Sequence, residues 1–170
     1  MPDYGISSGG AEAEERFMEL TGAGPAPKAS LGDAVIDDHP VEIKRASSTT
    51  LNQVRAVKYI PLVAFHTPTQ TWYVVPAHDV VRLVSAKGRG QHTENPFESA
   101  TLSINHLDSF QIPDESQLLN AVKEAITEAN KYPKLSGEMS RVLAESKKLA
   151  KRSVSRVRDK LKEYNLTPNA

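Results

Sequence analysis

The sequence contains no cysteine, and this absence excludes disulfide bonds and thiolate zinc sites. No apolar run approaches the roughly 18 residues that span a bilayer, so we expect no membrane segment. The N-terminus has no basic region followed by an apolar stretch, so we expect no signal peptide. Together these absences predict a soluble protein with a cytoplasmic localisation.

Several common functional motifs are also missing. The chain has no P-loop, no nucleotide-binding glycine motif and no internal repeat, and its histidines show no metal-ligand spacing. Its 170 residues are enough for one domain, or for one domain with an appendage. With these motifs missing, the remaining candidates for a functional site are groups of acidic and basic side chains.

Charge is balanced overall but unevenly distributed. Lys and Arg together number 21, as do Asp and Glu, so the protein has no global basic footprint. Residues 1–40 carry 2 basic and 8 acidic side chains, whereas 41–93 carry 7 and 2. Residues 94–133 carry 2 and 7, and 134–170 carry 10 and 4. The two basic blocks could face phosphate while the acidic blocks hold metal, or all four could be solvated surface.

Residues 31–44 predict a β-hairpin around which the chain is organised. A short apolar arm, Ala34–Ile36, is followed by four turn-forming residues, 37–40, and by a second arm from Val41. With all four residues in the turn, Ile36 faces Val41.

This register brings three charged side chains together. Asp33 is expected opposite Lys44, and Glu42 shares a face with Lys44 because side chains alternate along a strand. Two carboxylates beside one ammonium are costly to pack unless they are used, and a divalent cation between the carboxylates would fit. The alternative is a surface hairpin with an Asp33–Lys44 salt bridge.

The pattern of Asp33, eight further residues and then Glu42-Ile43-Lys44 resembles the motif of the PD-(D/E)XK nuclease superfamily. That superfamily includes many type II restriction endonucleases and Holliday-junction resolvases. Gly32 stands where the family usually has proline. The resemblance implies an α/β (α+β) fold with a restriction-endonuclease-like core, in which helices flank a central mixed β-sheet, plus a helical C-terminal extension.

The resemblance also implies a mechanism. Asp33 and Glu42 would hold Mg²⁺, with Mn²⁺ as a substitute and the Ile43 carbonyl as a further ligand. Lys44 would position the attacking water or stabilise the transition state. The family's usual products carry 5′-phosphate ends. One such site cuts one strand, so symmetric cleavage of double-stranded DNA suggests a homodimer.

A helix is predicted over residues 11–20, with an apolar stripe of Ala13, Phe17 and Leu20. Family members often carry on this helix a glutamate that reaches the metal site. Glu14 matches best, Glu15 competes with it, and a solvated helix face would explain either.

A second helix is predicted over residues 51–59. Gln53 fits a capping box that starts at Thr50, and it also fits a glutamine that supports the active site in some family members. Arg55 and Lys58 could contact phosphates, which would add affinity but no sequence information.

Strands are predicted over 61–65, 71–75 and 100–104, and a helix over 77–85. The loop over 86–96 is predicted to contact DNA, because glycine allows close approach to phosphate and long loops are often functional. Arg89 or Lys87 could read guanine in the major groove. Its candidate DNA-binding residues are Lys87, Arg89, Gln91 and His92.

We therefore divide the chain into a flexible arm over 1–10, a nuclease core over 11–112 and a helical region over 113–170. The last region is predicted to contain helices within 114–132 and over 136–164. The second of these could contact DNA, form a dimer or pack on the core as an arm. The expected function is a Mg²⁺-dependent DNA endonuclease, a type II restriction enzyme. The alternatives are a junction-resolving or homing endonuclease, or a catalytically idle DNA-binding module.

Overall fold

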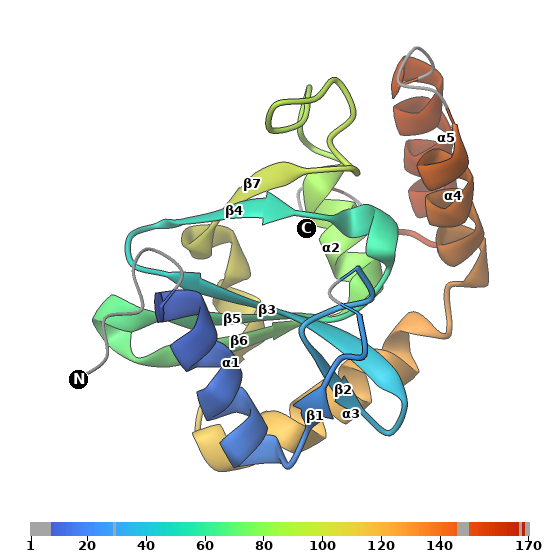
Figure 1. The fold of residues 1–170 in the computed structure, drawn as a ribbon. Coiled ribbons are helices and arrows are strands. Elements are labelled where there is room, and N and C mark those ends of the chain that lie inside the picture. The colour runs from blue at the N-terminus through green and yellow to red at the C-terminus, as the bar shows by residue number, and fades with distance from the viewer. Residues whose placement is uncertain (1–7, 29, 146–149, 167, 169–170) are drawn as a thin grey trace.

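The computed structural model describes residues 8–28, 30–145, 150–166 and 168 (Figure 1). The fold is α/β, with a mixed central sheet flanked by helices. The strands are β1 (Gly24–Pro25), β2 (Ala34–Ile36), β3 (His39–Ala46), β4 (Thr50–Val54), β5 (Leu62–His66), β6 (Thr71–Val75), β7 (Ala100–Ser103) and β8 (Gln111–Ile112). The α-helices are α1 (Ser8–Thr21), α2 (Ala77–Val84), α3 (Leu118–Ala129), α4 (Pro133–Ala144) and α5 (Ala150–Glu163). The 3-10 helices are η2 (Ala56–Lys58), η3 (Thr67–Thr69), η4 (Ile104–Phe110) and η5 (Glu115–Gln117).

The central sheet has six strands in the order β1-β2-β3-β5-β6-β8. Neighbouring strands are antiparallel except β3 and β5, which are parallel, with Glu42 opposite Leu62 and Lys44 opposite Ala64. A parallel pair needs a crossover connection. Here β4 and η2 supply it, and β4 leaves the central sheet to pair with β7 in a two-stranded sheet.

Helices α1 and α3 cover one face of the central sheet, and Figure 1 shows them on the same side of it. They cover it because each carries an apolar stripe at helical spacing. Their buried residues pack against those that β3, β5 and β6 direct to the same side. The core on this face includes Phe17, Ile43, Val63, Trp72, Leu118 and Val122.

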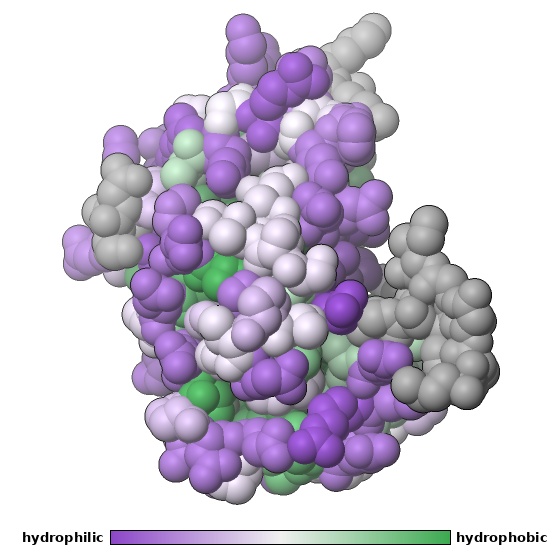
Figure 2. Space-filling view, turned by 90° about the vertical axis from the view of Figure 1, so that its left-hand side faces the viewer, coloured by the Kyte–Doolittle hydropathy of each residue, from purple (hydrophilic) through white to green (hydrophobic). Residues whose placement is uncertain are grey.

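The opposite face packs against β4, β7, η2, α2 and the C-terminal helices. Because alternate residues of a strand face opposite sides, Leu62 and Ala64 enter this second core while Val63 enters the first. Its largest buried side chains include Leu51, Leu62, Phe97, Leu102, Leu135 and Met139. No helix within the described ranges is long and apolar enough to cross a membrane. On the side seen in Figure 2, hydrophilic residues separate the few apolar ones.

Most predicted elements are confirmed within a few residues, including strands β5, β6 and β7 and helices α2 and α3. The helix predicted over 51–59 is wrong, because residues 50–54 form β4 and only 56–58 are helical. Leu51 and Val54 are both buried at a spacing of three residues, which suggested a helix. The spacing instead comes from a register shift between these two residues in the pairing with β7.

The long C-terminal helix predicted over 136–164 is also wrong, since two helices lie side by side there (Figure 1). Helix α4 ends at Ala144, because the next residue, Glu145, has an extended backbone conformation (ψ 155°). Helix α1 begins at Ser8, three residues before its predicted start, and residues 1–7 of the predicted arm lie outside the described ranges.

Candidate active site

The hairpin that carries the predicted motif is tighter than expected. Asp37 and Asp38 alone form the turn, both with positive φ (49° and 65°), and Ile36 pairs with His39. Two-residue turns with positive φ at both positions match the twist of the flanking strands, and Asp tolerates this conformation. The predicted four-residue turn, and with it the pairing of Ile36 with Val41, is therefore wrong.

The register differs from the prediction by two residues, so no side chain changes face. Ala34 pairs with Val41, and one step further the register places Asp33 opposite Glu42 instead of Lys44. Ala34, Val41 and Ile43 are buried, while Asp33, Glu42 and Lys44 are intermediate in exposure. The three charged residues of the motif therefore share the face that the sequence predicted.

Hydrogen bonds fix Asp33 at the point where β2 begins. Its backbone N–H donates to the Val41 carbonyl at 2.9 Å, and its Oδ2 accepts from the Ile43 N–H at 2.8 Å. The Glu42 N–H donates to the Pro61 carbonyl on the other side of β3 at 3.0 Å. Since alternate residues of a strand direct their N–H and carbonyl groups to opposite neighbours, the Ile43 carbonyl points to the side where Asp33 lies.

Two lysines bracket Glu42. Lys44 Nζ lies 3.5 Å from Glu42 Oε1, and Lys58 Nζ lies 3.1 Å from Glu42 Oε2. The Glu42 and Lys58 side chains are each only 14% exposed, which distinguishes this triad from a solvated surface pair. Lys58 belongs to η2, so the crossover between β3 and β5 brings it to the hairpin.

Helix α1 supplies a third carboxylate. Burial raises the pKa of Glu14, the carboxylates of Asp33 and Glu42 raise it further, and the Lys44 ammonium opposes them. Glu14 therefore lies within electrostatic reach of all three motif residues. Glu15, the competing candidate, is exposed. The helical phase set by Ala13 and Phe17, both buried, turns Glu14 toward β3.

The electrostatics of Asp33 favour a cation. Burial is the largest cause that raises its pKa, and the Glu42 carboxylate adds to it. The Ile43 N–H and the ammonium groups of Lys44 and Lys58 lower it but do not offset the rise. A cation near the half-buried Asp33 carboxylate would therefore favour its ionised form.

The donor set suits a hard divalent cation. In the part of the chain that the structure describes, no three His, Cys, Asp or Glu side chains already form a group able to hold a metal ion. Mg²⁺ does not require such a cage, because it commonly takes one or two carboxylates together with waters and substrate phosphate. Asp33 and Glu42 provide two carboxylates, and the Ile43 carbonyl is a further oxygen donor on the same side.

Gly32 explains why the residue before Asp33 is not proline. Its φ of +156° lies outside the range that proline and other L-residues favour. A Cβ here would lie 3.1 Å from Pro40 Cβ and from the Val41 carbonyl oxygen, and 3.2 Å from the Val41 nitrogen. Glycine therefore lets the chain approach β3 closely just before Asp33.

The remaining predicted residues lie elsewhere. Gln53 is exposed on β4, not on a helix, and its N–H donates to Gln91 Oε1 at 2.7 Å, so this bond ties β4 to the loop over 86–96. Arg55 is exposed and donates to the Glu98 carbonyl at 3.0 Å. The predicted DNA contacts at Lys87, Arg89, Gln91 and His92 stay predictions.

Sequence reasoning placed Lys58 among the phosphate contacts and missed its pairing with Glu42. No local signal identifies this pairing, because it depends on the parallel alignment of β3 with β5. Comparison with protein-family models, with curated proteins and with solved structures found no match to this chain.

Proposed function

We propose that the protein is a Mg²⁺-dependent DNA endonuclease with a restriction-endonuclease-like core. One observation carries the proposal: Asp33, Glu42 and Lys44 share one face of a hairpin, and Glu14 and Lys58 join them from other elements. A structural salt bridge would need one acid and one base. Here three carboxylates and two ammonium groups gather around the start of β2.

Asp33 and Glu42 would hold the ion, with the Ile43 carbonyl beside them. A bound Mg²⁺ supplies Lewis-acid polarisation of the scissile phosphate and of a water molecule. The hydrogen bond from the Ile43 N–H holds the Asp33 carboxylate in one orientation. Such preorganisation matters because a ligand set that is already oriented needs little rearrangement during the reaction.

The lysines would serve the phosphate. In the structure both ammonium groups contact Glu42. If one Glu42 oxygen held the ion, Lys58 or Lys44 would be free to contact the phosphate oxygens, where negative charge would develop. Glu14, whose pKa is raised by burial and by the neighbouring carboxylates, would accept a proton from the attacking water.

We further propose double-stranded DNA as the substrate and sequence-specific cleavage by a type II enzyme that acts as a homodimer and leaves 5′-phosphate ends. Single sites of this kind cut one strand, and a two-fold dimer presents two of them to a palindrome. The exposed loop over 86–96, with Arg89 and His92 at its surface, is the proposed reader of bases.

The test is cleavage of a large, sequence-diverse DNA with Mg²⁺ by the wild type, by Lys44→Ala and by Lys123→Ala. Lys123 is the matched control, because its partner is Asp37 in the exposed turn. We expect discrete fragments from the wild type and the control, and a loss of about 100-fold or more in Lys44→Ala.

Two outcomes would revise or refute the proposal. Cutting confined to branched DNA would replace the restriction function by junction resolution. No cutting of either substrate, together with no Ca²⁺ or Mg²⁺ binding in calorimetry that depends on Asp33, would show a catalytically idle module.

A further inference from the structure

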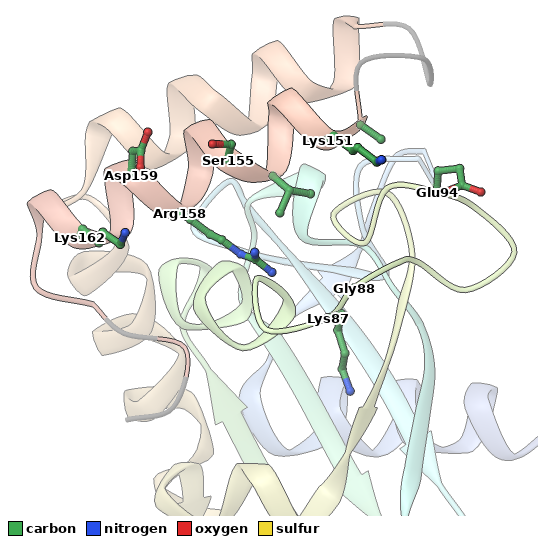
Figure 3. A pocket seen from close by; sticks show the side chains of 10 residues that line it. Lys87, Gly88, Glu94, Lys151, Ser155, Arg158, Asp159 and Lys162 are labelled. Atoms are coloured by element: carbon green, nitrogen blue, oxygen red, sulfur yellow. The ribbon is translucent and has the colours of Figure 1, made fainter.

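A cleft lies away from the hairpin, between α5 and the loop that follows α2 (Figure 3). Its volume is about 360 Å³. Lys87, Gly88 and Glu94 line it from the loop, and Lys151, Val154 and Arg158 are among the residues that line it from α5. None of the residues that bracket Glu42 lines this cleft.

Helix α5 directs a stripe of cations along the cleft. Lys151, Arg158 and Lys162 follow one another at seven and four residues, a spacing that keeps them on one side of a helix. Lys151 and Lys162 are exposed and have no carboxylate partner within the described ranges. In Figure 3 Lys151 and Arg158 extend from α5 toward the loop, whereas the Lys87 side chain runs away from the helix.

Arg158 holds this wall of the cleft in place. Its Nε and Nη2 both donate to the Ser85 carbonyl, at 2.9 and 2.7 Å, just beyond the end of α2. A guanidinium is favourable there, because carbonyl groups at a helix C-terminus lack partners and carry partial negative charge. The position of the stripe relative to the loop is therefore fixed.

Two of the other cations of α5, Arg156 and Lys160, are paired with carboxylates, whereas Arg152 is exposed and does not line the cleft. Arg156 donates to Glu138 at 3.0 Å and to Glu145 at 2.7 Å, which binds α5 to α4. Lys160 pairs with Glu163 at 3.3 Å. Arg156 and Lys160 thus have paired charges and do not line the cleft, whereas Lys151 and Lys162 line it with charges that are unpaired among the described residues. The lining also contains the carboxylates of Asp159 on the helix and Glu94 on the loop.

We infer that this cleft binds the phosphate backbone of nucleic acid. From Lys151 to Lys162 the helix rises about 16 Å, enough to reach two or three successive phosphates of one strand. The Val154 side chain, which lies between Lys151 and Arg158 in the sequence, offers apolar surface for the sugars of the nucleic-acid backbone. The inference deepens the proposed function, on which the identity of the ligand as the substrate DNA rests.

The experiment measures binding without cleavage. A fluorescein-labelled 20-base-pair duplex and the matching single strand are titrated in EDTA, at 50 to 200 mM salt, with wild type and with the double variant Lys151→Gln/Lys162→Gln. Glutamine keeps the helix propensity of lysine while it removes the charge. Lys160→Gln is the matched control on the same helix.

We expect the double variant to reduce the salt slope of duplex binding by about 2 and the affinity at 100 mM salt by about tenfold. The control should stay within twofold of wild type. A similar loss for the single strand would identify the backbone of either form as the ligand.

Three results would overturn the inference: an unchanged slope in the double variant, an equal loss in Lys160→Gln, or displacement of DNA by 10 mM inorganic phosphate, which would reveal a site for small anions. Failure of the proposed function is distinguishable. It would abolish Mg²⁺-dependent cutting while these binding differences persist, whereas a failed inference would leave cutting by the double variant intact.

Discussion

Replacing Gly32 by alanine tests whether close approach at the start of β2 holds the candidate site together. The new Cβ would meet Pro40 and two backbone atoms of Val41 at 3.1 to 3.2 Å, at a φ of +156°. Strained backbone of this kind costs about 1–3 kcal/mol. The atoms that this Cβ would meet are mostly backbone atoms of β3, which cannot rotate away. We therefore expect the free energy of unfolding to fall by about 2–4 kcal/mol in total. For a chain of this length that lowers Tm by about 4–16 °C.

The assay pairs thermal unfolding with calorimetry of Ca²⁺ binding, and Gly24→Ala is the control. Gly24 has open space where its Cβ would lie and no positive φ, so its variant should melt within about 1 °C of wild type. Displacement of Asp33 from the Ile43 N–H should also weaken Ca²⁺ binding in Gly32→Ala by at least about tenfold. Equal melting temperatures for the two variants would refute the idea that Gly32 is required there.

Two further predictions concern charge in the site. Asp33→Asn and Glu14→Gln should each abolish or strongly reduce cutting yet raise stability slightly, by less than about 1 kcal/mol, because both carboxyls are partly exposed and screened. In the folded protein the pKa of Asp33 lies above its ordinary 3.8 and that of Glu14 above its ordinary 4.5, so the folded state binds more protons than the unfolded state. The free energy of unfolding of the wild type therefore falls as the pH rises from the ordinary pKa values through the raised ones. A flat urea midpoint over that window would contradict this. Lys58→Gln should tighten Ca²⁺ binding by about fivefold, through loss of an ammonium near the dication, yet slow cutting by about 100-fold. Weakening of both would mean that Lys58 only supports the fold.

The sequence was most informative about local pattern. The alternation of Ala34, Val41 and Ile43 with the charged residues correctly predicted which side chains share a face, even though the turn length was wrong. A register error of two residues leaves every side chain on its predicted face. The prediction that Asp33, Glu42 and Lys44 share one face was therefore unaffected by the wrong turn length. Helix phase likewise favoured Glu14 over Glu15; in the structure the pKa of Glu14 responds to Asp33, Glu42 and Lys44, whereas Glu15 is exposed.

The pairing of strands far apart in the chain could not be predicted from the sequence. Residues 50–54 became β4 because β7, about 50 residues later, offers them a partner, and a register shift there imitates helical spacing. The position of Lys58 depends on that pairing and on the parallel alignment of β3 with β5. No window around Lys58 contains this information, because it depends on contacts with distant strands.

The crossover through β4 and η2 separates the hairpin from Lys58 in the chain. We therefore expect the two parts of the site to form at different stages of folding. The hairpin with Asp33, Glu42 and Lys44 closes over a two-residue turn, so its loop entropy is small and it can form early in folding. Lys58 lies between longer-range contacts: β4 pairs with β7, and the neighbouring Tyr59 hydroxyl donates to the Ala129 carbonyl, 70 positions along the chain. Contacts of such high contact order form slowly. During synthesis the carboxylates would thus be exposed to cations before the second lysine arrives, and a chain cut short before α3 would keep the acidic pair but lose the clamp that surrounds Glu42.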